Sequence, residues 1–81
     1  MTMNEAIGVA NAKLRRDGTP GKPVSYKDFQ TRVGFFVSQS TGKDKEVGQK
    51  MLVVNKVTRE AQWVPIRKLG MAFLMTDTVD L

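Results

Sequence analysis

The chain has 81 residues, enough for one small domain, because hydrophobic cores divide only in much longer chains. It contains no Cys and no His, which excludes disulfides, thiolate metal sites and the commonest general base. We therefore expect neither an enzyme nor a bound cofactor or metal. The 13 Lys and Arg residues outnumber the 8 Asp and Glu residues and give a net charge of +5, which favours a polyanionic partner.

The sequence predicts neither a membrane-spanning segment nor a secretory signal. No apolar run approaches the ~20 residues that span a bilayer. The N-terminus lacks the charged and then apolar order of a secretory signal. We expect a cytoplasmic protein without a membrane partner.

A first helix is predicted at the N-terminus, over 1–18. Thr2 and Glu5 have the spacing of a capping box, in which two side chains satisfy free backbone amides at a helix start. Gly18 is expected to end the helix, and the segment 17–23, with two Pro and two Gly, is expected to be a loop. The apolar stripe of this helix consists of Met3, Ile7, Ala10 and Leu14.

A second, short helix is predicted over 25–33. Ser25 and Asp28 repeat the capping spacing, and Gly34 follows the last helical position. The apolar residues at three- and four-residue steps are Tyr26, Phe29 and Val33.

A β-hairpin is predicted in the second half of the chain. The run 51–57 is rich in β-branched residues, and a second apolar run, 61–66, follows a polar turn. Pro65 cannot donate a backbone hydrogen bond, so the second strand is expected to end near it. A last short helix is expected over 66–74.

The segment 34–49 has two interpretations, which the sequence leaves open. A strand at 35–37 would join the hairpin in a three-stranded antiparallel meander. Alternatively, a helix over about 38–50 would complete a helix-turn-helix, with the hairpin as its wing. Gly42 and Gly48 argue against that helix, since each costs about 1 kcal/mol relative to Ala.

The predicted fold class is α+β. N-terminal helices pack on a small antiparallel hairpin or meander, and a winged helix-turn-helix is the variant with the clearest function. We expect a single domain over 1–81, with an N-terminal helix at 1–18, a core unit at 24–75 and an acidic tail at 76–81.

The main functional signal is a set of basic residues around the predicted loop and hairpin. Cations on one face neutralise nucleic-acid phosphates, and release of counterions from the nucleic acid then drives binding. We therefore expect the basic residues between Lys22 and Arg59 to converge in space. They are Lys22, Lys27, Arg32, Lys43, Lys45, Lys50, Lys56 and Arg59.

Two other functions are weighed against DNA binding. A small protein without catalytic side chains could inhibit a host protein through an exposed apolar patch. That patch would comprise Phe35, Phe36, Met51 and Trp63. An RNA-binding sheet, suggested by the aromatic run at 32–37, ranks third.

Several short motifs resemble the small excisionases of temperate phages, in particular the Cox-type proteins, over about residues 24–74. They are Tyr26-Lys27-Asp28-Phe29, Val33-Gly34, Ser40-Thr41, Gln62-Trp63-Val64-Pro65-Ile66 and Leu69. In that family a short helix and a turn lead to a recognition helix, and a β-hairpin wing follows. Members bind DNA repeats cooperatively beside an integrase, and some repress transcription.

The resemblance implies a set of DNA contacts. Lys27 and Arg32 would hold phosphates, Lys56 and Arg59 would carry the wing to the DNA, and Trp63 would be structural. The residues implied to face the major groove are Ser38, Gln39, Ser40, Thr41 and Lys43.

The sequence therefore predicts a non-catalytic DNA-binding protein, an excision or transcription regulator of the phage or mobile-element type. Its expected partner is double-stranded DNA, with self-association on DNA or contact with an integrase. The alternative is a small phage-like protein that inhibits a host protein through the apolar patch.

Overall fold

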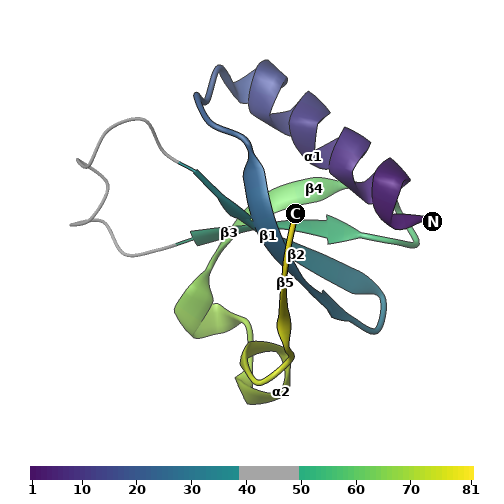
Figure 1. Ribbon diagram of the computed structural model, residues 1–81, viewed down its shortest axis with the longest axis vertical. Coiled ribbons are helices and arrows are strands. Elements are labelled where there is room, and N and C mark those ends of the chain that lie inside the picture. Colours follow the sequence, from purple (N-terminus) through teal and green to yellow (C-terminus); the bar gives the residue numbers. More distant parts are fainter. Residues whose placement is uncertain (39–49) are drawn as a thin grey trace.

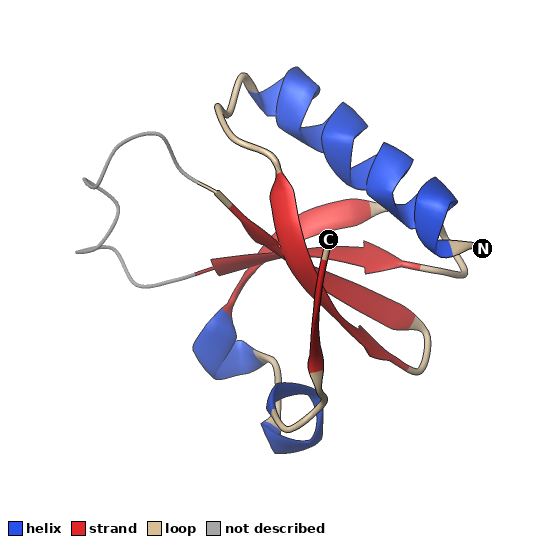
Figure 2. Ribbon diagram, in the orientation of Figure 1, coloured by secondary structure: helices blue, strands red, loops and turns tan. Residues whose placement is uncertain are grey.

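The computed structural model describes residues 1–38 and 50–81. One N-terminal helix packs on a five-stranded antiparallel sheet, with strand order β4-β3-β2-β1-β5 (Figures 1 and 2). The α+β class and the antiparallel meander are thereby confirmed. The elements in chain order are α1 (Met3–Asp17), β1 (Pro23–Phe29), β2 (Arg32–Val37), β3 (Lys50–Asn55), β4 (Ala61–Pro65), the 3₁₀ helix η2 (Ile66–Lys68), α2 (Met71–Leu74) and β5 (Thr78–Asp80).

Helix α1 begins and ends where the sequence predicts. The Thr2 hydroxyl accepts a hydrogen bond from the Glu5 amide at 3.2 Å, and the Glu5 carboxylate accepts one from the Thr2 amide at 2.9 Å. Gly18 has a φ of 64°, the left-handed conformation that ends many helices without steric cost. Ala6, Ala10 and Leu14 face the sheet and are buried.

The capping box predicts a dependence of stability on pH. The backbone hydrogen bond from Thr2 holds the pKa of the Glu5 carboxyl below its usual value, and the Thr2 side chain and the charge of Arg59 lower it further. A carboxyl whose pKa is lower in the folded state stabilises the fold above its unfolded pKa, and this contribution is lost as the pH falls through the folded pKa. Glu5→Gln should therefore lower the melting temperature at pH 7 and lower it by less at about pH 3, which is below the pKa of a Glu carboxyl in an unfolded chain.

Thermal unfolding at the two pH values checks this expectation. Glu60→Gln is the matched control, because it removes an exposed carboxylate on the β3–β4 turn that makes no capping contact. A difference between Glu5→Gln and the unsubstituted chain that stays constant from pH 7 to pH 3 would rule out the proposed role of the Glu5 charge.

The predicted helix over 25–33 is wrong, because this segment forms most of the β1–β2 hairpin. Phe29 pairs with Arg32 across a tight turn, and Gln30 adopts a φ of 53° there. The local spacing of apolar residues fits a helix, but in the hairpin Tyr26 and Val33 face one core and Phe29 faces the other. Gln30 is neither Gly nor Asn, so the turn carries no recognisable sequence signal.

The β3–β4 hairpin is confirmed, with Leu52 opposite Trp63 and β4 ending at Pro65. The run 35–37 belongs to β2, which pairs with β3, so the meander is the observed alternative. The first helix of the predicted helix-turn-helix, 25–33, does not exist, because these residues belong to β1 and β2. Its second predicted helix lies outside the described residues, except for the ends of that segment.

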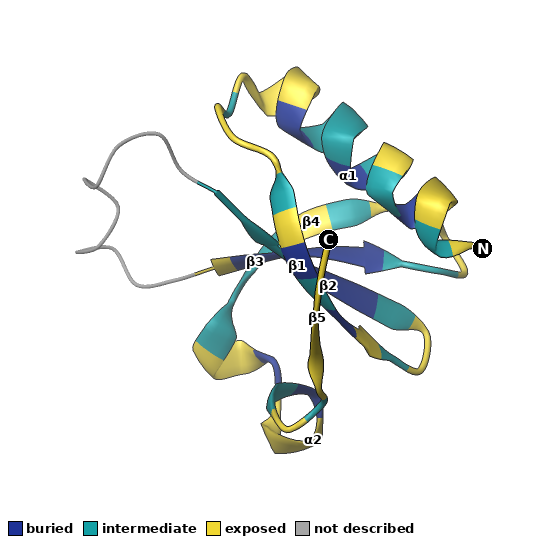
Figure 3. Cartoon of the chain, in the orientation of Figure 1, coloured by how far each residue is buried: buried dark blue, intermediate teal, exposed yellow. Residues whose placement is uncertain are grey.

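Both faces of the sheet are covered (Figure 3). On one face α1 covers Val33, Phe35, Leu52 and Val54. The segment after β4 covers the other face, where Phe73 and Leu69 pack on Met51 and Val53.

This arrangement corrects the predicted apolar patch. Phe35 and Met51 have no exposed surface, and Phe36 and Trp63 are half-buried beside the two cores. Four residues that belong to opposite faces of one sheet cannot form a single docking surface.

The last part of the chain is only partly helical. Gly70, with a φ of 84°, separates η2 from α2, so the helix predicted over 66–74 is two short pieces. The predicted acidic tail contains β5, which pairs with β1.

Candidate nucleic-acid interface

The ten predicted DNA contacts divide into two groups. The structure describes Lys27, Arg32, Ser38, Lys56 and Arg59, whose surroundings can be examined one by one. The predicted contacts that lie outside the described residues are Gln39, Ser40, Thr41, Lys43 and Lys45.

Lys27 is buried in the sheet. Its side chain lies on β1, the residue is only 9% exposed, and its ammonium group donates a hydrogen bond to the Thr76 carbonyl at 2.6 Å. Strand alternation points this side chain away from α1 and towards the C-terminal segment. Lys27 therefore ties that segment to β1 and is not available to hold a phosphate.

Lys56 and Arg59 lie on the β3–β4 turn, and both are paired with carboxylates. The Lys56 ammonium group contacts Asp28, and the Arg59 guanidinium lies 3.6 Å from the Glu5 carboxylate. Each pair is partly exposed to water, so it adds little stability. It nevertheless reduces the positive potential that this end of the molecule presents.

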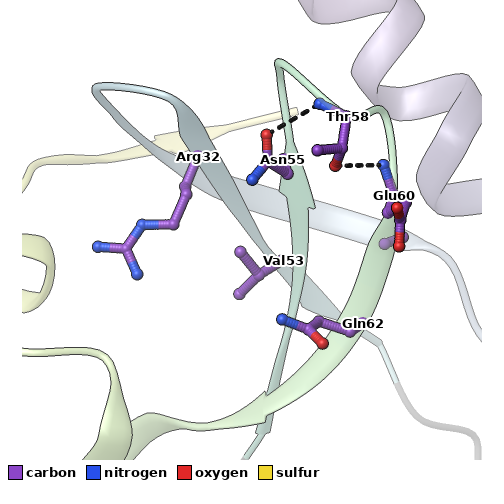
Figure 4. A pocket seen from close by; sticks show the side chains of 7 residues that line it. Arg32, Val53, Asn55, Thr58, Glu60 and Gln62 are labelled. Carbon is purple, nitrogen blue, oxygen red and sulfur yellow. Dashed lines mark hydrogen bonds between the residues drawn. The ribbon is translucent and has the colours of Figure 1, made fainter.

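Arg32 borders a shallow cavity of about 260 Å³ (Figure 4). Its guanidinium lies 5.2 Å from the centre of the Phe73 ring, a cation–π geometry. Asn55, the residue of β3 that pairs with Arg32, accepts hydrogen bonds from the amides of Val57 and Thr58. These polar groups hold the β3–β4 turn, and they include no pair suited to acid–base chemistry.

Ser38 lies at the opposite end of the sheet. Its hydroxyl accepts a hydrogen bond from the Lys22 amide at 3.1 Å, and its own amide donates to the Lys22 carbonyl at 2.8 Å. The described predicted contacts are thus spread over both ends of the sheet and one buried position. Among the described basic residues between Lys22 and Arg59, the expected convergence is limited to Lys22 and Lys50, which lie at the same end.

A different group of cations gathers at the end of the sheet where Ser38 lies. The starts of β1 and β3 and the ends of β2 and β4 meet there, because the strands are antiparallel. Figure 1 shows the end of α1 and the helix η2 on the same side of the molecule. We call this region the basic end; its cations are Arg15, Arg16, Lys22, Lys50, Arg67 and Lys68.

All six cations of the basic end are exposed, and none forms an ion pair with another described residue. The described carboxylates lie mostly elsewhere. Asp17, at the end of α1, is 3.3 Å from Lys13 and also accepts a hydrogen bond from the Trp63 ring nitrogen. Asp80 lies on β5, opposite Ser25. The positive charge of this region is therefore little reduced by its described neighbours.

Sequence reasoning missed most of the basic end. In the sequence, Arg15 and Arg16 have only the features of favourable charges at a helix C-terminus. Arg67 and Lys68 follow the half-buried strand β4 and carry no motif. Their common position depends on the order of the strands, which local patterns do not contain.

Comparison of the chain with protein-family models, curated proteins and solved structures found no match. Within residues 1–38 and 50–81, no helix is both long and apolar enough to cross a membrane. In the same residues, no three acidic side chains gather in a way that could hold a metal ion.

Proposed function

We propose that this chain is a non-catalytic DNA-binding protein that contacts duplex DNA through the basic end. The observation that carries the proposal is the gathering of six exposed cations where four strand ends, α1 and η2 meet. Such a group neutralises phosphates and displaces their counterions, which supplies affinity that is independent of base sequence.

The shape of the basic end suits a contact with a phosphate backbone. Lys22 and Lys50 flank the starts of β1 and β3, two strand spacings apart, or roughly 10 Å. Arg15 and Arg16 extend the surface beyond one face of the sheet, and η2 extends it beyond the other. The cations can thus reach several phosphates while the two cores keep the scaffold rigid.

A role in excision or in transcription regulation of a phage or mobile element is the finer part of the proposal. It is supported by the resemblance of the motifs in 24–74 to Cox-type excisionases. The tip of the β3–β4 hairpin lies away from the basic end, so in this protein the hairpin is not proposed as a DNA-contacting wing. Self-association on DNA and contact with an integrase remain predictions.

The double substitution Arg67→Gln and Lys68→Gln tests the proposed surface. Both side chains are exposed on η2, so folding should be little affected. Loss of two phosphate contacts should weaken binding to a labelled duplex oligonucleotide at least about tenfold in dilute buffer. Fluorescence anisotropy measures the change.

Lys56→Gln with Arg59→Gln is the matched control, because it removes the same charge from the other end of the sheet. We expect it to weaken DNA binding by less than about threefold, since those cations are already paired. Equal losses in both double variants would show a dependence on net charge alone. Tighter binding to an RNA hairpin than to the duplex would replace DNA by RNA as the ligand.

A further inference from the structure

The outer edge of β5 has free backbone hydrogen-bonding groups. Among the described strands, β5 pairs only with β1, and the Leu81 amide donates to the Val24 carbonyl at 2.9 Å. In an antiparallel pair, successive residues alternate between inward and outward backbone groups. Val79 therefore bonds to β1 as Leu81 does, whereas the amides and carbonyls of Thr78 and Asp80 point away from the sheet.

An exposed apolar surface lies beside this edge. Val79 is opposite Tyr26 on the face of the sheet that α1 covers elsewhere. Two apolar residues on this face remain accessible, since Val79 is 45% exposed and Leu81 is 54% exposed. Val24, which accepts the Leu81 amide hydrogen bond at the irregular start of β1, is 39% exposed.

The charge of this edge is opposite to that of the whole chain. Asp77 precedes β5 and Asp80 is its last residue, and both are exposed in a protein of net charge +5. A second copy would bring the same two carboxylates to the same edge, and like charges on neighbouring strands destabilise a sheet. A strand that carries basic residues would be attracted there.

The other edge of the sheet, along β4, differs in its side chains. Pro65 ends β4 and has no amide to donate. Trp63, in the same strand, packs against the α1 core and donates its ring N–H to Asp17. By the same alternation, Ala61 and Trp63 turn their backbone groups outward on β4. The choice of β5 therefore rests on the apolar and acidic side chains beside it.

We propose that the outer edge of β5 binds an extended segment of a partner protein in which apolar and basic residues alternate. The partner backbone pairs with Thr78 and Asp80, as in other complexes formed by strand addition. Its apolar side chains lie beside Val79 and Leu81. Because side chains alternate between the faces, its basic side chains lie on the other face, beside Asp80. This contact is independent of the proposed DNA binding at the basic end.

The test uses the full chain and a short capped peptide of alternating lysine and valine, followed by the amide NMR signals of the protein. We expect saturable shifts centred on Thr78 and Asp80, and slower hydrogen exchange at those two amides. The same peptide with all of its backbone amides N-methylated cannot pair and should not bind. A peptide with glutamate in place of lysine should bind more weakly than the lysine peptide.

Two substitutions test the predicted contacts, and each has a defined control. Val79→Asp should weaken peptide binding more than about tenfold, since burying a valine side chain is worth enough for such a factor. Val57→Asp, at a residue 74% exposed on the β3–β4 turn, should have no effect. Asp80→Lys should weaken binding of the lysine peptide and strengthen binding of the glutamate peptide.

Three results would overturn the proposal. One is the absence of saturable shifts with the lysine peptide, and another is equal binding of the N-methylated peptide. The third is a dependence of the Thr78 and Asp80 signals on protein concentration without peptide, which would assign this edge to a second copy of the chain.

Discussion

Replacement of Phe73 by alanine is expected to destabilise the domain by about 3–5 kcal/mol, a large part of the stability of a small protein. Phe73 is 1% exposed and belongs to the core on the side of the sheet opposite α1. Its ring contacts Phe29 edge to face, with 5.9 Å between the ring centres, and lies next to the Arg32 guanidinium. Phe73→Ala would leave a cavity and remove both aromatic contacts. Urea denaturation measures the loss.

The control comes from the same short helix. Met71 is 72% exposed and Met75, which directly follows α2, is 75% exposed. Either Met→Ala substitution should change the free energy of unfolding by no more than about 0.5 kcal/mol. If Phe73→Ala also had so small an effect, the C-terminal segment would not be an integral layer of the fold.

Gly34 shows why this layer was missed in the sequence. It was interpreted as the end of a helix, but it lies in the middle of β2, opposite Lys27 and Val53. A Cβ atom at this position would lie 2.6 Å from the end of the Phe73 ring and 2.9 Å from the Met51 methyl group. The glycine is therefore needed for close packing across the sheet, and no local pattern distinguishes that role from a helix stop.

The elements predicted correctly are those whose signals lie within a few residues. The capping box at Thr2 and the left-handed Gly18 define α1 without reference to the rest of the chain. The β-branched residues of β3 and the proline that ends β4 likewise define their hairpin. The prediction for 25–33 is wrong because its local apolar spacing fits a helix and a hairpin equally well. Only pairing with residues far along the chain decides between them.

The candidate site was less predictable than the fold, because a charged surface depends on topology. Net charge indicates an anionic partner, but it does not show which cations lie together. Lys27 illustrates the difficulty: in the sequence it is one basic residue among many, and in the structure it is a buried donor to the Thr76 carbonyl. By contrast, Arg16 and Lys68 are far apart in the chain and lie at the same end of the sheet.

The salt dependence of DNA binding is the largest effect that the proposed interface predicts. If all six cations of the basic end contact phosphates, the logarithm of the binding constant should fall with the logarithm of salt concentration with a slope of about −5. Between about 50 and 200 mM salt the affinity should then drop by roughly a thousandfold. Anisotropy titrations of a duplex oligonucleotide at several salt concentrations give this slope directly.

The same salt titrations of the two double variants distinguish the contribution of the basic end from that of the other surface cations. Arg67→Gln with Lys68→Gln should make the slope shallower by about 2, because each lost phosphate contact contributes about one unit. Lys56→Gln with Arg59→Gln should leave it unchanged, although the net charge of the two variants is the same. A slope near zero for the unsubstituted chain would remove the electrostatic contact on which the proposal depends. A steep slope that both variants reduce equally would show that binding depends on net charge and not on the basic end.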